Sequence, residues 1–215
     1  MSKVVLGALW VVLTTLPFFL RYVIKQKYEK LRKALQDQED DSYYQCLFFG
    51  PKNFSCKSHF YDKKECGEFC SFTQFERLIH YIVSAKKSVS LCMYILTLKQ
   101  VQTSLIQLNR KGIKVRIITD KVMHQTKVAQ ELFAGLKENG IEFRIPDSTE
   151  QLMHNKYCLI DETDEQHAKV FFGSLNLTSQ AVLKNFESVI LTNNKDIIGR
   201  LSDEFEYLWR SLKES

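Results

Sequence analysis

The sequence predicts an α/β fold in which helices sandwich a mixed, largely parallel sheet. Beyond residue 70, short apolar runs rich in β-branched and aromatic residues alternate with segments of helical periodicity. Strands that alternate with helices are commonly joined by crossover connections, which favour parallel neighbours. A chain of 215 residues with 45% hydrophobic residues can bury the core of one domain and carry a small appendage.

The expected elements follow one another along the chain. Strands are predicted over residues 47–49, 88–96, 114–119, 141–145, 157–160, 170–172 and 188–191. Helices are predicted over residues 73–87, 99–111, 126–139, 178–185 and 196–212. A Thr73-x-x-Glu76 capping box indicates the start of the first helix. Cys92 and Cys158 lie inside apolar runs and are expected to pack in the core.

The N-terminal segment predicts a membrane anchor over residues 1–24. Residues 4–20 are almost wholly apolar, and with the next few residues they reach the length of a bilayer span. Lysines and arginines follow the span, so the rest of the chain is expected to face the cytosol. A cleaved signal peptide is the alternative, but no small-x-small cleavage site follows. Residues 25–41 predict a charged helical stalk, and residues 42–215 the folded domain.

Residues 46–70 predict a small zinc-binding module. The two close pairs Cys56-x2-His59 and Cys66-x3-Cys70 would supply three thiolates and an imidazole to a tetrahedral Zn²⁺. Cys46 is a substitute ligand if His59 is not one. Free thiols or a disulfide are the alternatives, and a cytosolic location disfavours the disulfide.

The strongest chemical signal is His154-x-Lys156-x4-Asp161, followed by a Gly-Ser-x-Asn pattern at residues 173–176. Positions i and i+2 of a strand point to the same face, so His154 and Lys156 would converge on one spot. An imidazole can attack phosphorus or protonate a leaving oxygen, and an ammonium attracts phosphate oxygens. Ser174 and Asn176 can donate hydrogen bonds to the same oxygens.

Two acidic residues each have two alternative roles. Glu187 begins the last predicted strand, where it can accept from the second nitrogen of the His154 imidazole and hold its tautomer. The alternative for Glu187 is an ordinary surface acid at a strand end. Asp161 is assigned to the catalytic set, but it can instead be structural and bind backbone groups at the end of its strand.

Attack and protonation in one reaction need two histidines on opposite sides of the phosphate. The chain has five histidines. His59 is assigned to zinc, His80 to a helix surface and His167 to a solvated turn, whereas His124 follows a strand and could line a substrate groove. The motif occurs once, so the second catalytic histidine is expected to be His154 of a second copy across a two-fold axis.

These residues resemble the signature of the phospholipase D superfamily. The anchor, the Cys/His insertion and the single motif resemble the mitochondrial members of that superfamily that carry one motif copy. The resemblance implies an outer-membrane homodimer facing the cytosol, a phosphohistidine at His154 and protonation by the partner's His154. It also implies that no catalytic metal is used and that the zinc is structural.

The resemblance leaves two phosphodiester substrates open. One is single-stranded RNA, cut endonucleolytically in the piRNA pathway, and the other is cardiolipin, hydrolysed to phosphatidic acid. A formal net charge of +5 permits a polyanionic partner. Nucleic acid is favoured because a basic rim is available, from Lys99, Lys121, Lys184 and Lys195, whereas the nearest apolar residues are Met123 and Met153. A non-catalytic membrane scaffold is the remaining alternative.

Overall fold

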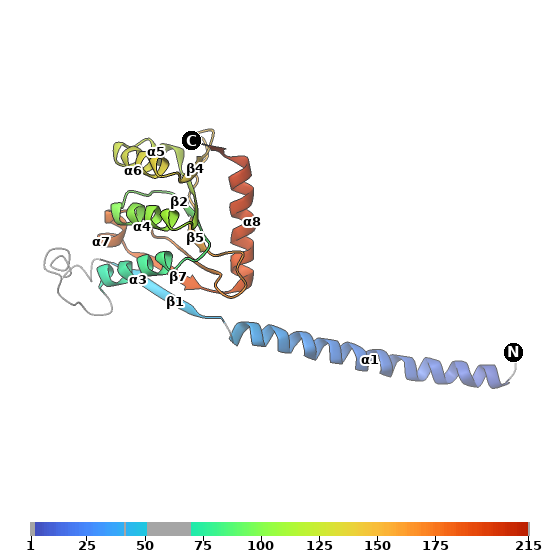
Figure 1. Ribbon diagram of the computed structural model, residues 1–215. Helices are drawn as coiled ribbons and strands as arrows, with labels where there is room; N and C mark the ends of the chain where they lie inside the picture. The colour runs from blue at the N-terminus through green and yellow to red at the C-terminus, as the bar shows by residue number, and fades with distance from the viewer. Residues whose placement is uncertain (1–2, 41, 51–69, 215) are drawn as a thin grey trace. The chain divides into compact units, whose positions relative to one another are not determined.

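The computed structural model describes residues 3–40, 42–50 and 70–214, which divide into two compact units, Met1–Ser42 and Tyr43–Ser215. The first unit is one continuous helix, α1 (Lys3–Asp40), which joins the predicted anchor and stalk (Figure 1). Within the described ranges, no helix has an apolar stretch long enough to cross a membrane. The anchor over residues 1–24 therefore stays a prediction.

The second unit is built on an eight-stranded sheet. Its strands are β1 (Tyr44–Phe49), β2 (Ser88–Met93), β3 (Lys114–Thr119), β4 (Glu142–Ile145), β5 (Lys156–Ile160), β6 (Lys169–Gly173), β7 (Glu187–Thr192) and β8 (Lys213–Glu214). They lie in the order β1-β7-β6-β5-β2-β3-β4-β8. Strand β5, which carries the motif, therefore lies in the middle of the sheet.

The sheet is mixed, as predicted, but the expectation that it is largely parallel is wrong. Only β2, β3 and β4 pair in parallel among the described strands, and every other neighbouring pair is antiparallel. Parallel neighbours need a crossover, usually a helix. The segments between β4 and β5 and between β5 and β6 contain no helix, so the chain turns back on itself there.

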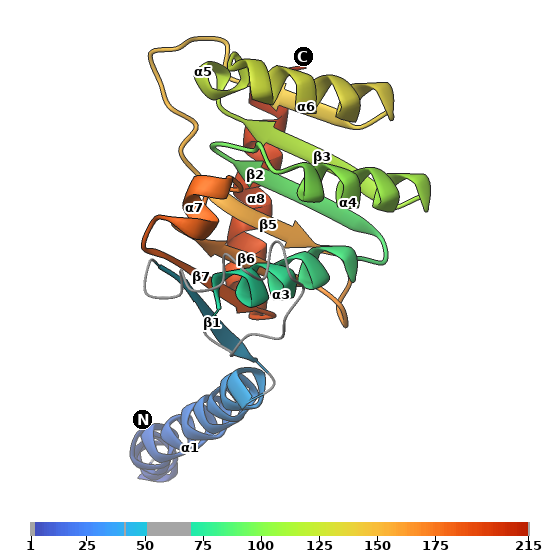
Figure 2. The same cartoon turned by 90° about the vertical axis from the view of Figure 1, so that its left-hand side faces the viewer.

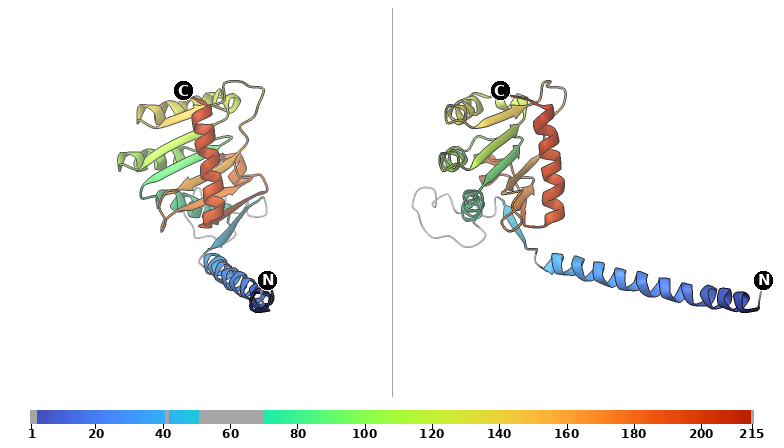
Figure 3. Two further views of the ribbon diagram at one scale, coloured as in Figure 1. Left: turned by 90° about the vertical axis from the view of Figure 1, so that its right-hand side faces the viewer. Right: turned by 45° about the vertical axis from the view of Figure 1, so that its right-hand side comes forward.

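Helices cover both faces of the sheet. The helices are α3 (Ser71–Val83), α4 (Lys99–Arg110), α5 (Lys121–His124), α6 (Lys127–Glu138), α7 (Ser179–Leu183) and α8 (Lys195–Ser211). Figures 1 and 2 show α3, α4 and α6 on one face and α8 on the other, and Figure 3 shows α8 crossing in front of the sheet. Each face has its own apolar core, the larger including Phe133 and Leu105 and the smaller Phe205 and Trp209.

The start of α3 and the cysteines test several predictions. Helix α3 begins at Ser71 after Cys70, which provides no side-chain cap, so the predicted capping box does not start this helix.

Cys92 and Cys158 are fully buried, as expected, and burial raises the pKa of both thiols. Both are therefore packing residues that resist ionisation.

The predicted zinc module lies mostly outside the described residues. Cys56, His59 and Cys66 are not described, whereas Cys70 is buried before α3 and Cys46 is exposed on β1. Among the residues that are described, no three potential ligands are grouped to hold a metal ion. The zinc site therefore stays a prediction.

Candidate active site

The predicted phosphate-binding residues meet at one edge of the sheet. Lys156 begins β5, Gly173 ends β6 and Glu187 begins β7. Tyr157 pairs with Phe172, and Gly173 pairs with Val189, so these three strand ends are adjacent. We call this side of the sheet the motif edge. It is the edge at which the parallel strands have their carboxyl ends, where α/β folds commonly bind ligands.

His154 and Lys156 lie together against one aromatic ring. The Tyr94 ring centroid is 4.6 Å from that of His154 and 5.0 Å from the Lys156 ammonium. The Lys156 ammonium also donates to the His154 carbonyl oxygen at 2.8 Å. The backbone N–H of Tyr94 donates to the Asn155 carbonyl at 3.0 Å, which extends the β2–β5 pairing into the motif. Imidazole and ammonium are thus side by side, as the i, i+2 spacing predicts.

The electrostatic state of Lys156 depends on burial. Burial lowers the pKa of Lys156 below the ordinary lysine value, while the charge of Glu187 acts in the opposite direction. Its side chain is partly buried and His154 is exposed. The site therefore offers an accessible nucleophile beside a cation that is incompletely solvated, and such a cation attracts a phosphate oxygen more strongly than one in bulk water.

Gly173 is required because β6 and β7 approach each other closely. A Cβ at Gly173 would lie 2.1 Å from the Ser188 carbonyl oxygen. This approach lets the Ser174 N–H donate to the Ser188 carbonyl at 3.0 Å and lets the Ser188 N–H donate to the Ser174 hydroxyl at 3.1 Å. The glycine of the Gly-Ser-x-Asn pattern thus fixes Ser174 at the motif edge.

Glu187 binds neighbours on β6 and on the loop before β7. Its carboxylate accepts hydrogen bonds from the Ser174 hydroxyl and, at 2.9 Å, from the Asn185 amide. Neither contact involves His154. The predicted contact from Glu187 to the imidazole therefore stays a prediction, whereas its place beside Ser174 is observed.

Asn176 has an incomplete set of hydrogen bonds. Its side-chain oxygen is buried, and no donor among the described residues reaches it. A buried acceptor without a donor is costly, so such atoms in native proteins call for an explanation such as a ligand. Asn176 lies just after β6, on the side that carries Ser174. The orphaned oxygen is the feature that an arriving ligand or a second subunit could complete.

Asp161 is separated from the other motif residues by the length of β5. At about 3.3 Å per residue, seven residues place it roughly 20 Å from His154. Its carboxylate is buried and accepts hydrogen bonds of 2.6–3.1 Å from the backbone N–H groups of Lys86, Lys87 and Ser88. The structural alternative is therefore what the geometry shows, and the placement of Asp161 with the catalytic set is not supported.

One residue that sequence reasoning missed positions the segment that carries His154. Asp120 follows β3, is buried, and caps α5 by accepting from the N–H groups of Val122 and Met123. Its second oxygen accepts from the N–H of Met153 at 3.1 Å, one residue before His154. An aspartate before a helix is a recognisable capping signal in the sequence. The hydrogen bond between Asp120 and Met153, 33 residues later, could not be predicted from the sequence.

The remaining predicted site residues divide between the two edges of the sheet. Lys99, Lys121 and Lys184 follow strands that end at the motif edge, whereas Lys195 begins α8 at the opposite edge. The His124 ring packs on Phe133 and Phe143, with centroids 5.1 and 5.3 Å away. Met153 is buried, so the exposed apolar residues beside the motif are Leu152 and Phe186 instead.

Comparison with known proteins decides the family. A family model described as "Cardiolipin synthase, PLD-like domain" matches residues 78–209, which include every motif residue and most of the sheet. The chain belongs to this family. The assignment confirms the predicted membership of the phospholipase D superfamily, an enzyme family of phosphodiesterases.

Several relatives and solved structures are similar to the chain. It is 31% identical over 139 residues to the mitochondrial cardiolipin hydrolase of Danio rerio, covering 65% of this chain but only 58% of that protein. The protein of the same name from Xenopus tropicalis is 28% identical over 187 residues, covering 86% of this chain and 81% of that one. Both relatives are mitochondrial by name.

The fold also matches solved structures. Nuc from Salmonella typhimurium, described as a phospholipase D family member, has a TM-score of 0.65 and 19% identity, covering 81% of this chain and 99% of Nuc. NucT from Helicobacter pylori has a TM-score of 0.57 and 20% identity, covering 79% of this chain and 98% of NucT. At these identities the matches show the fold, which is thereby confirmed as phospholipase D-like.

Proposed function

We propose that the protein is a phosphodiesterase that forms a phosphohistidine intermediate at His154. The observation that carries the proposal is the exposed imidazole beside Lys156 and the Ser174–Glu187 pair at one edge of the sheet. The imidazole attacks phosphorus, the P–O bond to the leaving group breaks, and water later displaces the histidine. Lys156 attracts the phosphate oxygens throughout, and no step uses a metal ion.

The leaving oxygen needs a proton, and among the described residues no second histidine is in contact with His154. The His124 ring packs against the rings of Phe133 and Phe143. His80 lies on α3, and His167 lies beyond β5 at the opposite edge. We therefore assign the acid to the partner's His154 in a two-fold dimer. The orphaned oxygen of Asn176 supports a site that is completed by another molecule.

Mixing subunits tests the shared site. The full chain is combined with increasing amounts of the His154→Ala variant under conditions that allow subunit exchange, and hydrolysis of a chromogenic phosphodiester is measured. If each site needs both histidines, only dimers of two unsubstituted chains are active. An equal mixture then retains about a quarter of the activity of the same total amount of unsubstituted protein. About half would remain if each chain worked alone, and that result would contradict the dimeric site.

Two observations favour cardiolipin as a substrate. The relatives described above are named mitochondrial cardiolipin hydrolases. Exposed apolar side chains also flank the catalytic residues, with Leu152 at 61% and Phe186 at 76% exposure. Acyl chains of a lipid require such an apolar border, and the protein would then release phosphatidic acid at the mitochondrial outer membrane. Anchoring by the apolar N-terminal segment is part of this proposal.

Single-stranded RNA is the second candidate, as an endoribonuclease of the piRNA pathway. Lys99 and Lys184 are exposed near the motif edge and can contact the backbone of a strand. In this proposal, as in the lipid one, the structural Zn²⁺ is held by the predicted module at residues 46–70. The relevant chemistry is the same for both substrates, so the catalytic residues do not distinguish them.

Paired assays with the full chain distinguish the substrates. Cardiolipin liposomes and labelled single-stranded RNA are incubated separately in EDTA, and phosphatidic acid and RNA fragments are quantified. We expect product from cardiolipin, with loss of activity in His154→Ala and Lys156→Ala. A Phe186→Ser, Leu152→Ser variant should lower lipid hydrolysis while a Lys99→Gln, Lys184→Gln variant should not. RNA cleavage with the reverse pattern would support the second candidate, and no cleavage of either substrate would overturn the proposed activity.

A further inference from the structure

The edge of the sheet opposite the motif edge carries a second His-x-Lys pair. His167 and Lys169 are two residues apart at the start of β6, the same spacing as His154 and Lys156 at the start of β5. Because β5 and β6 are antiparallel, the two pairs lie at opposite edges. The second pair cannot therefore belong to the catalytic site of the same chain.

A cavity of about 310 Å³ lies beside this second pair. Its lining includes the basic side chains of Lys86, His167 and Lys169, together with Tyr43, Ser84 and Asp161. A volume of this size is sufficient for a phosphate group with its hydration or with a small substituent. The residues come from the segments just before β1, after α3, between β5 and the start of β6, and after β7, all within the second unit.

Within the described ranges, His167 is the basic residue of the cavity that pairs with a carboxylate, that of Asp164. Among the described residues, neither Lys86 nor Lys169 forms an ion pair with an acid. The Lys169 ammonium donates to the Ser84 hydroxyl and lies 4.7 Å from the Tyr81 ring centroid. Burial lowers the pKa of Lys169, the charge of Asp161 acts in the opposite direction, and repulsion from Lys86 adds a smaller decrease. An anion between the two ammonium groups would relieve the repulsion.

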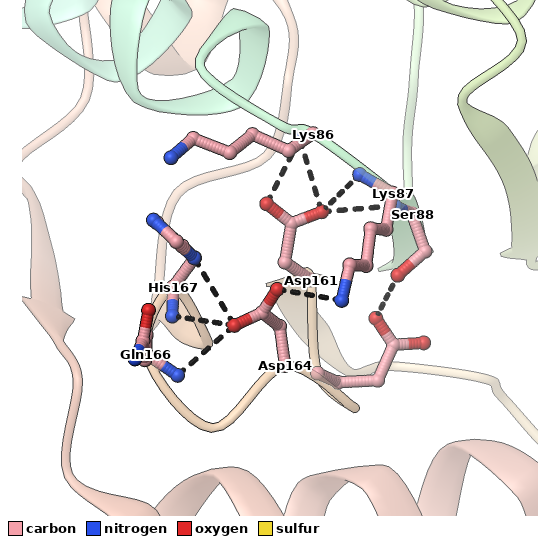
Figure 4. Close-up of polar contacts among 8 residues, drawn as sticks. Lys86, Lys87, Ser88, Asp161, Asp164, Gln166 and His167 are labelled. Atoms are coloured by element: carbon pink, nitrogen blue, oxygen red, sulfur yellow. Dashed lines mark hydrogen bonds and ion pairs between the residues drawn. The ribbon is translucent and has the colours of Figure 1, made fainter.

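His167 is oriented toward the same space. Its Nδ1 contacts the Asp164 carboxylate at 3.1 Å, and Asp164 is also paired with Lys87 at 2.8 Å. Figure 4 shows the second ring nitrogen of His167 and the Lys86 ammonium on the same side of the cluster. An imidazole held through one nitrogen presents the other to a ligand.

The acid in the cavity wall is already satisfied. Asp161 accepts from three backbone N–H groups, those of Lys86, Lys87 and Ser88, which stabilise its charge. Asp161 as a residue is only 1% exposed. Its charge attracts Lys169, but no ion pair joins the two side chains, so the Lys169 ammonium keeps hydrogen-bonding capacity for an anion.

We propose that this cavity is a second anion site, which binds a phosphate group between Lys86, His167 and Lys169. The phosphate belongs either to a free small anion or to the headgroup of an anionic lipid, because both present the same oxygens. The site is independent of the proposed catalytic function, since it shares no residue with the motif edge.

Calorimetric titration with inorganic phosphate tests the site. The full chain carries His154→Ala and Lys156→Ala, so that phosphate binding at the motif edge is removed. We expect saturable binding in this background, and at least a tenfold weaker Kd after Lys86→Gln and Lys169→Met are added. Methionine keeps the aliphatic contact of residue 169 with Tyr81, and a thermal unfolding curve checks that the variant is folded. The matched control is Lys111→Gln with Lys137→Gln, two exposed lysines outside the cavity.

Vesicle flotation distinguishes the two sources of phosphate. The same variants are floated with phosphatidylcholine vesicles that either contain or lack phosphatidic acid. Lysine-dependent binding to the phosphatidic acid vesicles, together with phosphate binding, supports a lipid headgroup, and phosphate binding alone supports a free anion. The proposal is overturned if phosphate does not bind in the background variant, or if the control substitutions weaken binding as much as the cavity substitutions do.

Discussion

The two ends of β5 carry the two parts of the His-x-Lys-x4-Asp motif, and they differ in how their polar groups are satisfied. At the start of β5, His154 is exposed and the Lys156 ammonium donates to a carbonyl within the motif. At the end of β5, the Asp161 carboxylate is buried and filled by backbone N–H groups. The polar groups at the first end can still form hydrogen bonds with a ligand. The carboxylate at the second end already accepts hydrogen bonds that join the α3–β2 turn to β5.

This difference indicates that one sequence motif contains residues with a reactive role and a residue with a structural role. A group that accepts a reacting phosphate must be accessible and must keep hydrogen-bonding capacity, whereas a group that holds a turn must have none left. Substitutions at the two ends should therefore fail in different ways. A substitution at the start of β5 should lower the activity of the protein without lowering its stability. A substitution at the end of β5 should lower the stability without lowering the activity.

The largest expected effect is on activity, from His154→Ala. Loss of the nucleophile should lower kcat by a factor on the order of 10⁴ or more. The free energy of unfolding should change by less than about 0.5 kcal/mol, because the side chain is exposed. Single-turnover kinetics and urea denaturation measure the two quantities. Residual activity within tenfold of the unsubstituted chain would remove His154 from the nucleophile role.

The largest expected effect on stability comes from Asp161→Ala. Three backbone N–H groups would lose their buried acceptor, so the free energy of unfolding should fall by roughly 3–5 kcal/mol. Asp161 also has a φ of 52°, which alanine tolerates less well. Urea denaturation measures the change, and Asp196→Asn is the control, because the Asp196–Arg200 pair is exposed.

Activity per folded molecule should survive in the Asp161 variant if the comparison between the two ends holds. It is measured at a temperature where the variant remains folded, as judged by circular dichroism. A fall in kcat as large as that of His154→Ala, in folded protein, would show that both ends of β5 act in the chemistry.

A smaller effect is expected from Asp120→Ala, which removes the tether to Met153. A displacement of the reacting group by about 1 Å can lower the rate by about 10²-fold, so we expect kcat to fall about 10- to 100-fold with little change in KM. Loss of the α5 cap should also cost about 1 kcal/mol of stability.

A second helix cap provides the control for that prediction. Asn194 caps α8 by accepting from the Ile197 N–H and lies at the opposite edge of the sheet. Asn194→Ala should lower stability by a similar amount and leave kcat unchanged. Equal losses of kcat in the two variants would mean that Asp120 acts through general stability and not through His154.

The smallest effect is a displacement of the alkaline limb of the pH–rate profile. Lys156 must be charged to attract phosphate, and burial lowers its pKa from the ordinary 10.5. Activity should therefore fall as the pH rises through this lowered pKa, below the pH expected for a solvated lysine. Lys156→Arg should move the limb upward, because arginine stays protonated. A limb that does not move would assign it to another group.

The elements of the fold could be predicted from local sequence, but their directions could not. Strand β3 agrees with its predicted bounds at residues 114–119, and the other predicted strands and helices differ from the observed ones mainly at their ends. Apolar periodicity reports which residues face a core, and it carries no information on whether neighbouring strands run parallel. Most neighbouring strands pair antiparallel, in part because the β4–β5 and β5–β6 connections contain no helix. The sequence prediction had assumed crossover connections instead.

The candidate site was predictable as far as it lies within one short stretch of chain. The sequence by itself determined the identity and spacing of His154 and Lys156, and the single copy of their motif. Tertiary structure decided that Asp161 belongs to the opposite edge, that Asp120 tethers the residue before His154, and that a second His-x-Lys pair borders a separate cavity. The physical reason is that spacing along a strand fixes local direction, whereas buried hydrogen bonds between distant segments form only when the chain has folded.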